Sequence, residues 1–500
     1  MPRPPRRAWL IVLAVVLTSC AASHPARTPT PEGARLKYLL RVSPSDVRVE
    51  LDVRAPPGDR IPFQVTGTLG AGRDFRIVSE VTARDGSGAS VALTTPRPHH
   101  WEAQVPPDGR LRLSYVVRTD EEAHGLRLGE PGGGEMPKRD ERHVFLPGAL
   151  VFVAPTDLQS VRGPIPVEWE LPTGWEPLTP FGAEAPDLTA LLDNYLAAGR
   201  FSRAMVQARG GPRLDVAWFG EGDVARSQVP ALLTRVFDAA VTLMGGRAPT
   251  PGYVVMLRPD FPSGMAQGTP REGSIQVHLP RDVPLERVHQ TPVLARILAH
   301  EYLHTWGRER GEDLRSSEAP EAGGEMRWFG EGFIHYLSHL VLLRSGELDL
   351  PGFLAALGRE LAAVKQNPWY GRSSLTEASE RFFEDGDARA LSYGGGMLVA
   401  FLCDLELRSR GQGPLERFLD GVPPGKPLTR QAQWLEVWAR KTGSPEPVAT
   451  WLRARAPLPF EEALTRAGGT LMEKERRGHD ARREYVIQAA EQSLLGELMR

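Results

Sequence analysis

The sequence predicts an α+β protein of several domains, β-rich in its N-terminal part and helical in its C-terminal part. Short stretches of alternating residues, separated by glycine and proline, dominate before residue 210. Apolar residues at helical spacing dominate from about residue 229 onward. The chain has 500 residues, which is too long for one ordinary core and favours roughly two to four domains.

The composition is that of a folded chain. Hydrophobic residues make up 41% and charged residues 24%, so the chain can form large cores. The net charge of −2 argues against a protein that binds nucleic acid through bulk positive charge, and we expect no nucleic-acid partner. With only two cysteines, the chain has no disulfide framework.

Residues 1–19 have the pattern of a bacterial signal peptide. Three arginines precede the apolar residues 8–17, a stretch too short to span a bilayer as a stable helix. The Leu-Thr-Ser-Cys that follows resembles the lipobox of bacterial lipoproteins, in which the cysteine, here Cys20, becomes the lipid-carrying N-terminus. The alternative is an ordinary secretory signal. Residues 20–35 are small, polar and rich in proline, as in a flexible tether.

This N-terminus predicts a location. A lipid on Cys20 would anchor the protein to a membrane of the cell envelope, facing the periplasm or exposed at the surface. The outer membrane is favoured, because Ala21 rather than an aspartate follows the cysteine.

Residues 36–209 are expected to form a β-sandwich-like domain. Its expected strands alternate in polarity and are separated by turn signals: Val47–Val53, Pro62–Leu69, Leu111–Val117, Val144–Val153 and Pro166–Leu171. We find no catalytic cluster in this part of the sequence.

The rest of the chain is expected to form two further domains. Residues 210–348 combine strands with helices, and a helix is expected before Gly245 because apolar residues recur there at helical spacing: Leu232, Leu233, Val236, Phe237, Ala240 and Leu243. Residues 349–500 are expected to form a C-terminal α-helical domain, in which residues 470–500 form a charged terminal helix.

The residues that carry chemistry begin with His300-Glu301-x-x-His304. The apolar spacing around this motif predicts a helix, and positions four apart share one side of a helix. Two imidazoles placed in this way can bind one zinc ion at about 2.0–2.1 Å. Glu301 lies next to the first ligand and can take the proton of an activated water molecule.

A catalytic zinc site needs a third protein ligand, and the candidate is Glu331 in Trp-Phe-Gly-Glu-Gly-Phe. A carboxylate in such apolar surroundings needs a partner, because burying an unpaired charge is costly. The alternative is a glutamate on a helix surface. His335 and His339 follow on the same helix, and we interpret them as packing or orienting residues.

Tyr393 precedes three glycines at the start of a further apolar helix. Glycines allow another backbone to approach closely. The tyrosine hydroxyl could point at the zinc site and stabilise an oxyanion there, or Tyr393 could be a packing residue.

Together, HEYLHTW, WFGEGFIHY and SYGGGMLVAFLCDLELR resemble the glycyl aminopeptidase family of zinc metallopeptidases, which are gluzincins. The resemblance is strongest over residues 290–410 and extends over most of 36–470. It implies a thermolysin-like zinc peptidase domain at residues 210–348, behind the N-terminal β-domain, with Tyr393 contributed from residues 349–500. It also implies a peptide or protein substrate.

Carried over residue by residue, the resemblance implies that His300, His304 and Glu331 bind one Zn²⁺. Glu301 is then the general base, and Tyr393 supports the transition state.

One substrate segment departs from the family pattern. Gly264, Met265, Ala266 and Gln267 stand where the family carries a Gly-x-Met-Glu-type motif on the strand that lines the substrate cleft. Ala266 replaces the acid that would hold a substrate's free α-amine. Exopeptidase and endopeptidase specificity both stay open.

The sequence therefore predicts a lipid-anchored zinc metallopeptidase that uses zinc-activated water with Glu301 as the base. The alternative is a non-catalytic binding module that kept the fold and the metal. The presence of Glu301 favours the enzyme, because a structural zinc site needs no such base.

Overall fold

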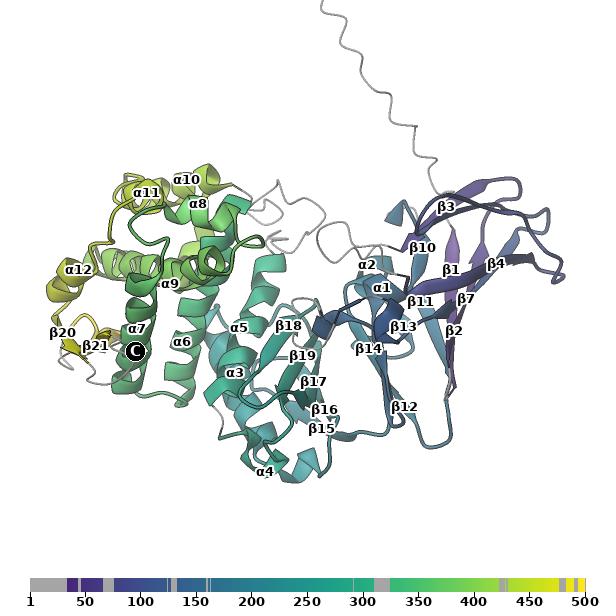
Figure 1. The fold of residues 1–500 in the computed structure, drawn as a ribbon, viewed down its shortest axis with the longest axis horizontal. Coiled ribbons are helices and arrows are strands. Elements are labelled where there is room, and N and C mark those ends of the chain that lie inside the picture. The colour runs from purple at the N-terminus through teal and green to yellow at the C-terminus, as the bar shows by residue number, and fades with distance from the viewer. Residues whose placement is uncertain are drawn as a thin grey trace, which may run out of the picture.

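The computed structural model describes residues 34–43, 46–65, 76–123, 125–126, 133–158, 161, 163–290, 292–309, 324–421, 428, 430–475, 483–489 and 493–499. The expected signal peptide, the lipidation site Cys20 and nearly all of the tether lie outside these residues. β-Sheets form one end of the molecule, a mixed sheet with helices its middle, and helices its other end (Figure 1). The α+β multidomain class predicted from the sequence is confirmed.

The N-terminal part contains three sheets. The first has the order β13 (Glu184–Ala185), β11 (Ile165–Glu170), β1 (Arg35–Val42), β2 (Val47–Arg54), β7 (Arg110–Val117) and β4 (Val78–Asp85). The second has the order β10 (Val153–Pro155), β3 (Arg60–Val65), β6 (His100–Gln104) and β5 (Leu93–Arg97). The third has the order β12 (Glu176–Leu178), β14 (Tyr195–Gly199), β9 (His143–Pro147) and β8 (Lys138–Arg139). Short helices connect these strands: η1 (Glu121–Ala123), η2 (Gly133–Glu135), α1 (Gly148–Val151) and α2 (Leu188–Leu192).

Alternation explains how these sheets pack. In β2 and β7 every second residue is buried, as expected for strands with one face on a core. Tyr38 reaches across this core, and its hydroxyl donates a hydrogen bond to the carbonyl of Val153 at 2.9 Å. The expected strand Val144–Val153 is interrupted by α1. Gly148 allows the interruption, because a Cβ there would lie 2.2 Å from the carbonyl oxygen of Leu191.

A five-stranded sheet forms the middle of the molecule. Its order is β15 (Ser202–Gln207), β16 (Arg213–Trp218), β17 (Gly252–Phe261), β19 (Ser274–Pro280) and β18 (Gln267–Pro270). Strands β16, β17 and β19 are parallel, whereas β18 runs antiparallel to β19 at the edge. The accompanying helices are η4 (Val224–Arg226), α3 (Val229–Leu243), α4 (Leu285–Val288) and α5 (Pro292–Glu309). Both α3 and α5 pack against this sheet (Figure 1).

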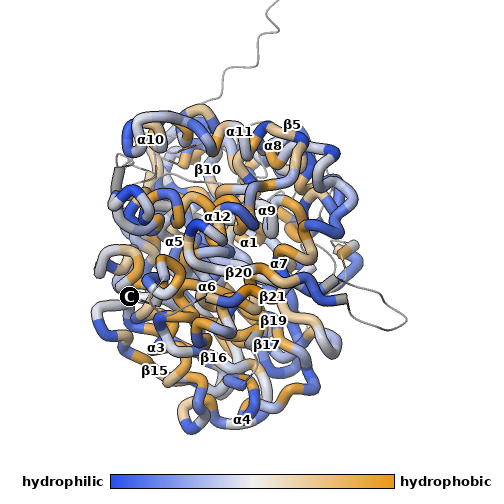
Figure 2. The backbone as a smooth tube through the Cα atoms, turned by 90° about the vertical axis from the view of Figure 1, so that its left-hand side faces the viewer, coloured by the Kyte–Doolittle hydropathy of each residue, from blue (hydrophilic) through white to orange (hydrophobic). Residues whose placement is uncertain are grey.

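The C-terminal part is mostly helical, as expected. Its helices are η5 (Gly324–Met326), the π-helix η6 (Trp328–Phe333), α6 (Ile334–Ser345), α7 (Leu350–Gln366), α8 (Leu375–Glu380), α9 (Gly386–Ser409), η7 (Leu415–Gly421), α10 (Gln431–Thr442), α11 (Val448–Arg453), α12 (Phe460–Arg466) and η8 (Gly496–Met499). One hydrophobic core continues from the five-stranded sheet through these helices. Along the chain the hydropathy alternates, as expected for elements with one buried face (Figure 2).

The expected helix over residues 470–500 is wrong. Strands β20 (Gly469–Glu475) and β21 (Arg483–Ala489) form an antiparallel hairpin instead. Tyr485 and Ile487 are both buried, and their spacing of two residues suits a strand. The hairpin packs on α7, where a Cβ at Gly358 would lie 2.2 Å from the carbonyl oxygen of Tyr485. The region 349–500 is therefore not wholly α-helical.

Among the described helices, α9 alone is long and apolar enough to cross a membrane by length and composition. In its most apolar window, 83% is buried inside the protein. Helix α9 thus has the surroundings of a core helix, which passes the same test.

Candidate active site

Helix α5 positions the HExxH motif. Its apolar side is buried, and Tyr302 stacks on Phe237 of α3 with ring centroids 4.0 Å apart. The same tyrosine meets Trp306 edge to face at 4.9 Å. Because this side of α5 is fixed against the core, His300 and His304 lie together on another side, with ring centroids 4.9 Å apart.

The third predicted ligand comes from the π-helix η6. Single π-turns are rare and occur often at functional sites. Glu331 Oε2 lies 3.4 Å from His300 Nε2 and 3.7 Å from His304 Nε2, and the two imidazole nitrogens are 3.2 Å apart. Ligand atoms around a tetrahedral zinc ion at ~2.0–2.1 Å are about 3.3–3.4 Å from each other. The three predicted ligands therefore fit zinc without rearrangement.

Helix α9 brings Tyr393 to these ligands through close backbone contact with η6. A Cβ on Gly396 would lie 2.2 Å from the carbonyl oxygen of Trp328, and one on Gly332 would lie 2.4 Å from the Cα of Gly396. Only glycine permits this approach. Tyr393 donates a hydrogen bond to Glu331, and its ring centroid lies 6.0 Å from that of His300.

The pKa values of Glu331, Glu301 and Tyr393 are shifted in different directions, which suits different roles. Burial acts to raise the pKa of Glu331, but His300, His304 and Tyr393 outweigh it and hold this pKa at about 2. Burial raises the pKa of Glu301 well above its ordinary value, and Glu331 and Glu135 raise it further. Burial and then Glu331 likewise raise the pKa of Tyr393. At neutral pH, Glu331 is therefore an anionic ligand and Tyr393 keeps its proton.

The predicted substrate segment lies at a turn and at the start of the edge strand β18. Gly264 has a φ of +77°, Met265 is 42% exposed, Ala266 is half-buried and Gln267 begins β18. The next residue, Gly268, is the one that contacts the site. A Cβ on it would lie 2.6 Å from Cγ of Glu301. Sequence reasoning missed Gly268, since a glycine at the start of a strand is a weak signal.

Sequence reasoning also missed a carboxylate from the β-rich part. Glu135 acts electrostatically on Glu301 and so lies near the catalytic residues. Arg271, between β18 and β19, binds Glu135 Oε2 at 2.5 Å, and the Tyr195 hydroxyl donates to the same oxygen at 3.3 Å. No local pattern relates Glu135 to residues 300–393, so the sequence offered no signal for it.

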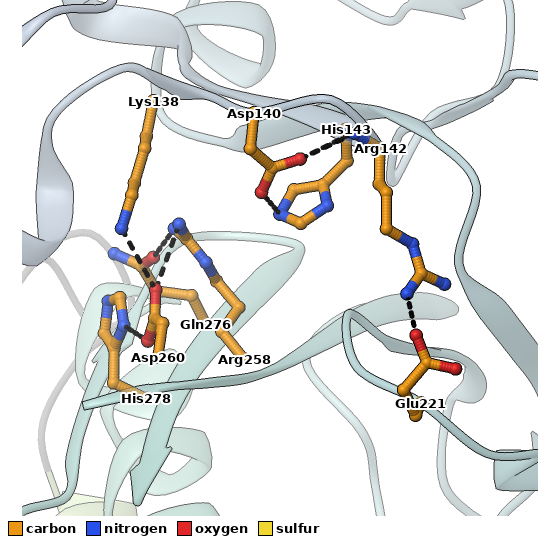
Figure 3. A network of polar contacts seen from close by, with 9 residues as sticks. All are labelled: Lys138, Asp140, Arg142, His143, Glu221, Arg258, Asp260, Gln276 and His278. Atoms are coloured by element: carbon orange, nitrogen blue, oxygen red, sulfur yellow. Dashed lines mark hydrogen bonds and ion pairs between the residues drawn. The ribbon is translucent and has the colours of Figure 1, made fainter. Parts of the chain in front are cut away.

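A network of polar groups links β17 and β19 to the β-rich part (Figure 3), and two of its members contact the backbone next to Glu135. Gln276 Nε2 donates to the carbonyl of Gly134 at 2.9 Å, and His278 Nε2 lies 3.3 Å from the same oxygen. Asp260 orients His278 through a 2.6 Å contact with Nδ1 and pairs with the buried Arg258 at 3.2 Å. The network thus joins β17 and β19 of the five-stranded sheet to the β-rich part.

His335 and His339 lie beside the ligands and are not among them. The His335 ring centroid is 6.0 Å from that of His300 and 6.2 Å from that of Tyr393. Its Nε2 lies 3.3 Å from Glu360 Oε1. His339 is buried and donates from Nδ1 to the carbonyl of His335 at 2.8 Å. These contacts agree with packing and orienting roles.

A separate cavity of about 400 Å³ lies on another face, between the β-rich part and β15. None of its lining residues belongs to the predicted site. Its three arginines have partners: Arg142 binds Glu221, Arg203 binds Asp215, and Arg200 donates to the carbonyl of Thr173. We assign no role to it.

The fold and the site are similar to those of one class of protein. A helical His-Glu-x-x-His pair, a downstream glutamate beside it and a β-rich part in front resemble the gluzincin architecture. Residues 293–394 match the family model described as M61 glycyl aminopeptidase. This match spans the predicted ligands, Glu301 and Tyr393, and it confirms the resemblance that those motifs suggested.

Solved structures show the same fold. An aminopeptidase N family protein from Idiomarina loihiensis is similar with a TM-score of 0.74 and 16% identity, over 92% of this chain and 82% of that chain. An M1 zinc metallopeptidase from Deinococcus radiodurans has a TM-score of 0.52 and 17% identity, over 86% of this chain and 95% of that chain. A mutant of the Deinococcus radiodurans enzyme bound to a Tyr-Ser-Ala substrate has a TM-score of 0.50 and 17% identity, over 86% of this chain and 96% of that chain. A comparison with curated proteins gives no significant match.

Proposed function

We propose that this protein is a zinc-dependent metallopeptidase, held at the cell envelope by a lipid on Cys20. The convergence of His300, His304 and Glu331 at the spacing of zinc ligands carries the proposal. The presence of Glu301 beside them, and the match of residues 293–394 to M61 glycyl aminopeptidases, support a peptidase.

The proposed reaction is hydrolysis of a peptide bond. A zinc ion held by the three ligands would supply Lewis-acid polarisation of the carbonyl and would acidify a water molecule. Glu301 accepts one proton of the attacking water and delivers it to the leaving nitrogen as the C–N bond breaks. The hydroxyl stays on the carbonyl carbon, so atoms and charge balance. Burial and the neighbouring carboxylates raise the pKa of Glu301, and a higher pKa makes a carboxylate a stronger proton acceptor.

Tyr393 stabilises the negative charge that develops on the carbonyl oxygen. Its raised pKa keeps the phenol protonated, so that it remains a hydrogen-bond donor. A fixed donor aimed at developing charge is among the strongest contributions an active site makes. Helix α9 holds Tyr393 in place through the glycine contact with η6.

We propose a peptide in extended conformation as the substrate. Strand β18 lies at the edge of the five-stranded sheet, and Gly268 within it packs against Glu301. An edge strand can bind an extended peptide through main-chain hydrogen bonds. A peptide beside β18 would therefore run past Glu301. The neighbouring structure with a bound Tyr-Ser-Ala substrate is consistent with this class of ligand.

The decisive experiment compares wild type with Glu301→Gln. We expect the protein that begins after Cys20 to bind one zinc ion and to cleave members of a mixed peptide library. The variant should keep the zinc and lose cleavage, because an amide cannot accept the proton. Zinc without cleavage by wild type would favour the alternative, a binding module that kept the metal. Absence of zinc from protein never exposed to a chelator would contradict the ligand assignment.

The anchor is tested separately. We expect full-length protein expressed in a bacterium to partition with membranes and to incorporate a labelled fatty acid. Cys20→Ser should abolish the label and release the protein from the membrane fraction. Equal labelling of both forms would contradict lipidation at Cys20.

A further inference from the structure

The charges around the catalytic residues bear on which peptides fit. An exopeptidase that removes N-terminal residues must bury the α-ammonium of its substrate close to the cleaved bond. A buried ammonium needs a carboxylate with unused capacity, because an unpaired buried charge is costly. Whether the described residues offer such a carboxylate near Glu301 is a question that rests on the proposed function.

The strand next to Glu301 offers none. Residues 264–270, which form the turn and strand β18, contain no acidic residue. Ala266 is half-buried and packs against the core with a methyl group. Gly268 has no side chain and lies against Glu301 itself. The edge strand can thus bind a peptide backbone, and it cannot bind an ammonium through charge.

Among the described residues, four carboxylates contact or act on the ligands, Glu301, Tyr393 or His335, and each has a task or a partner. Glu331 faces the two histidines and accepts from Tyr393. Glu301 is the proposed base. Glu360 pairs with His335 at 3.3 Å. Glu135 remains, and it is the carboxylate that the β-rich part extends toward Glu301.

Glu135 forms an ion pair with Arg271 of the same chain. Arg271 donates from Nη2 to Glu135 Oε2 at 2.5 Å, and the two side chains are only 18% and 16% exposed. Arg271 also lies over the ring of Tyr195 at 5.0 Å and contacts Asp193 at 3.6 Å, so its position is fixed from three sides. An ammonium brought to Glu135 would meet a guanidinium already there.

We propose that the ion pair with Arg271 prevents Glu135 from binding the α-amine of a substrate. The enzyme therefore cleaves internal or N-terminally blocked peptide bonds without requiring a free α-amine. The Glu135–Arg271 ion pair then lies between the β-rich part and β18. Arg271 determines specificity by occupying the carboxylate, and it takes no part in the reaction itself.

The test uses one octapeptide with a free N-terminus and the same octapeptide N-acetylated. We expect zinc-loaded wild type to cut both at the same bonds, with kcat/KM values within about threefold of each other. Glu135→Gln should leave this ratio unchanged. Arg271→Gln frees the carboxylate and should shift the ratio toward the free amine by about tenfold, the scale of a charged hydrogen bond. Arg203→Gln is the matched control, because it breaks the Arg203–Asp215 pair elsewhere on the same sheet.

The outcomes are separable. Loss of cleavage on acetylation by 100-fold or more in wild type would overturn this inference alone, and so would a selective loss of free-amine cleavage in Glu135→Gln. Cleavage of neither peptide nor any library member by zinc-loaded wild type would overturn the proposed function, and the inference with it. If Arg271→Gln does not fold, Glu135→Gln still decides the question.

Discussion

Tyr393 is the residue whose role is most open to a direct test. Its hydroxyl donates to Glu331 in this structure, and we assign it to the developing oxyanion when substrate is bound. We expect Tyr393→Phe to lower kcat by about 10²–10³-fold with little change in KM, since one such donor contributes on that scale. Bound zinc, measured by atomic absorption, should stay at the wild-type level. An unchanged kcat would make Tyr393 a packing residue.

The buried His339 is expected to make the folded protein less stable in acid. Its pKa is lowered from 6.5 to about 3, and burial is the main cause. The charges of His335 and Arg296 also lower this pKa, whereas Glu360 raises it. The unfolded chain therefore binds one more proton than the folded chain between those pH values. Stability from a neutral His339 is full above pH 6.5 and is lost as the pH falls, by on the order of 2 kcal/mol from pH 7 to pH 5.

The measurement for His339 is urea unfolding at several pH values. His339→Asn keeps a donor for the carbonyl of His335 and removes the titrating group. We expect the chelator-treated variant to lose less stability on acidification than chelator-treated wild type, because the contributions of the zinc ligands are then common to both. Parallel pH profiles would contradict the buried neutral state of His339.

The sequence predicted the residues of the site that local spacing controls, and it missed those that depend on tertiary contacts. His300, Glu301 and His304 share one helical motif, so their proximity follows from helix geometry. Glu331 was predicted from the need for a third ligand and from its apolar surroundings, whereas Tyr393 needed the family resemblance in addition. Glu135 lies in η2 and Arg271 in the turn between β18 and β19, and only the fold brings them together and toward Glu301.

At the scale of elements, the contact between α9 and η6 holds Tyr393 and Glu331 in position. Gly396→Ala would place a methyl group 2.2 Å from the backbone carbonyl of Trp328, which cannot move without shifting η6 and Glu331. We expect this variant to bind zinc at least tenfold more weakly and to unfold at a lower temperature, as overpacking usually costs about 1–3 kcal/mol. Competition with a chromogenic chelator measures the zinc affinity.

Gly395→Ala is the matched control for this contact. A methyl group there would meet only side-chain carbons of Leu375 and Leu391, at 3.0 and 3.2 Å, and these can rotate away. Zinc affinity should remain close to that of wild type. Equal loss of affinity in both variants would mean that the effect does not depend on the close approach of α9 to η6.

The elements that the sequence misassigned show which signals were ambiguous. Residues 470–500 are highly charged, and this favoured a solvated helix. The two-residue spacing of Tyr485 and Ile487 was the stronger clue, because it matches the buried face of β21. The π-helix over Trp328–Phe333 has no sequence signature, and its main packing partner is α9, which lies far away in the sequence.

At the scale of the whole molecule, the interface between the β-rich part and the five-stranded sheet, here called the joint, determines the position of Glu135. The joint contains a buried cation, because the Arg258 side chain is only 3% exposed. Asp260 balances this charge at 3.2 Å and also orients His278, which faces the carbonyl of Gly134. Removing one partner of such a pair leaves a buried charge uncompensated, at a cost of about 3–5 kcal/mol.

We therefore expect Asp260→Asn to weaken the joint as a whole. Calorimetry should show a lower unfolding temperature, with unfolding of the β-rich part separating from that of the helical part. Glu102→Gln is the control, because the Arg60–Glu102 pair lies at 3.3 Å on the surface with Arg60 61% exposed, and such pairs contribute about 0–1 kcal/mol. If Asp260→Asn unfolds as Glu102→Gln does, the network in Figure 3 contributes no more than a surface ion pair, and the position of Glu135 must depend on Arg271 and Tyr195 alone.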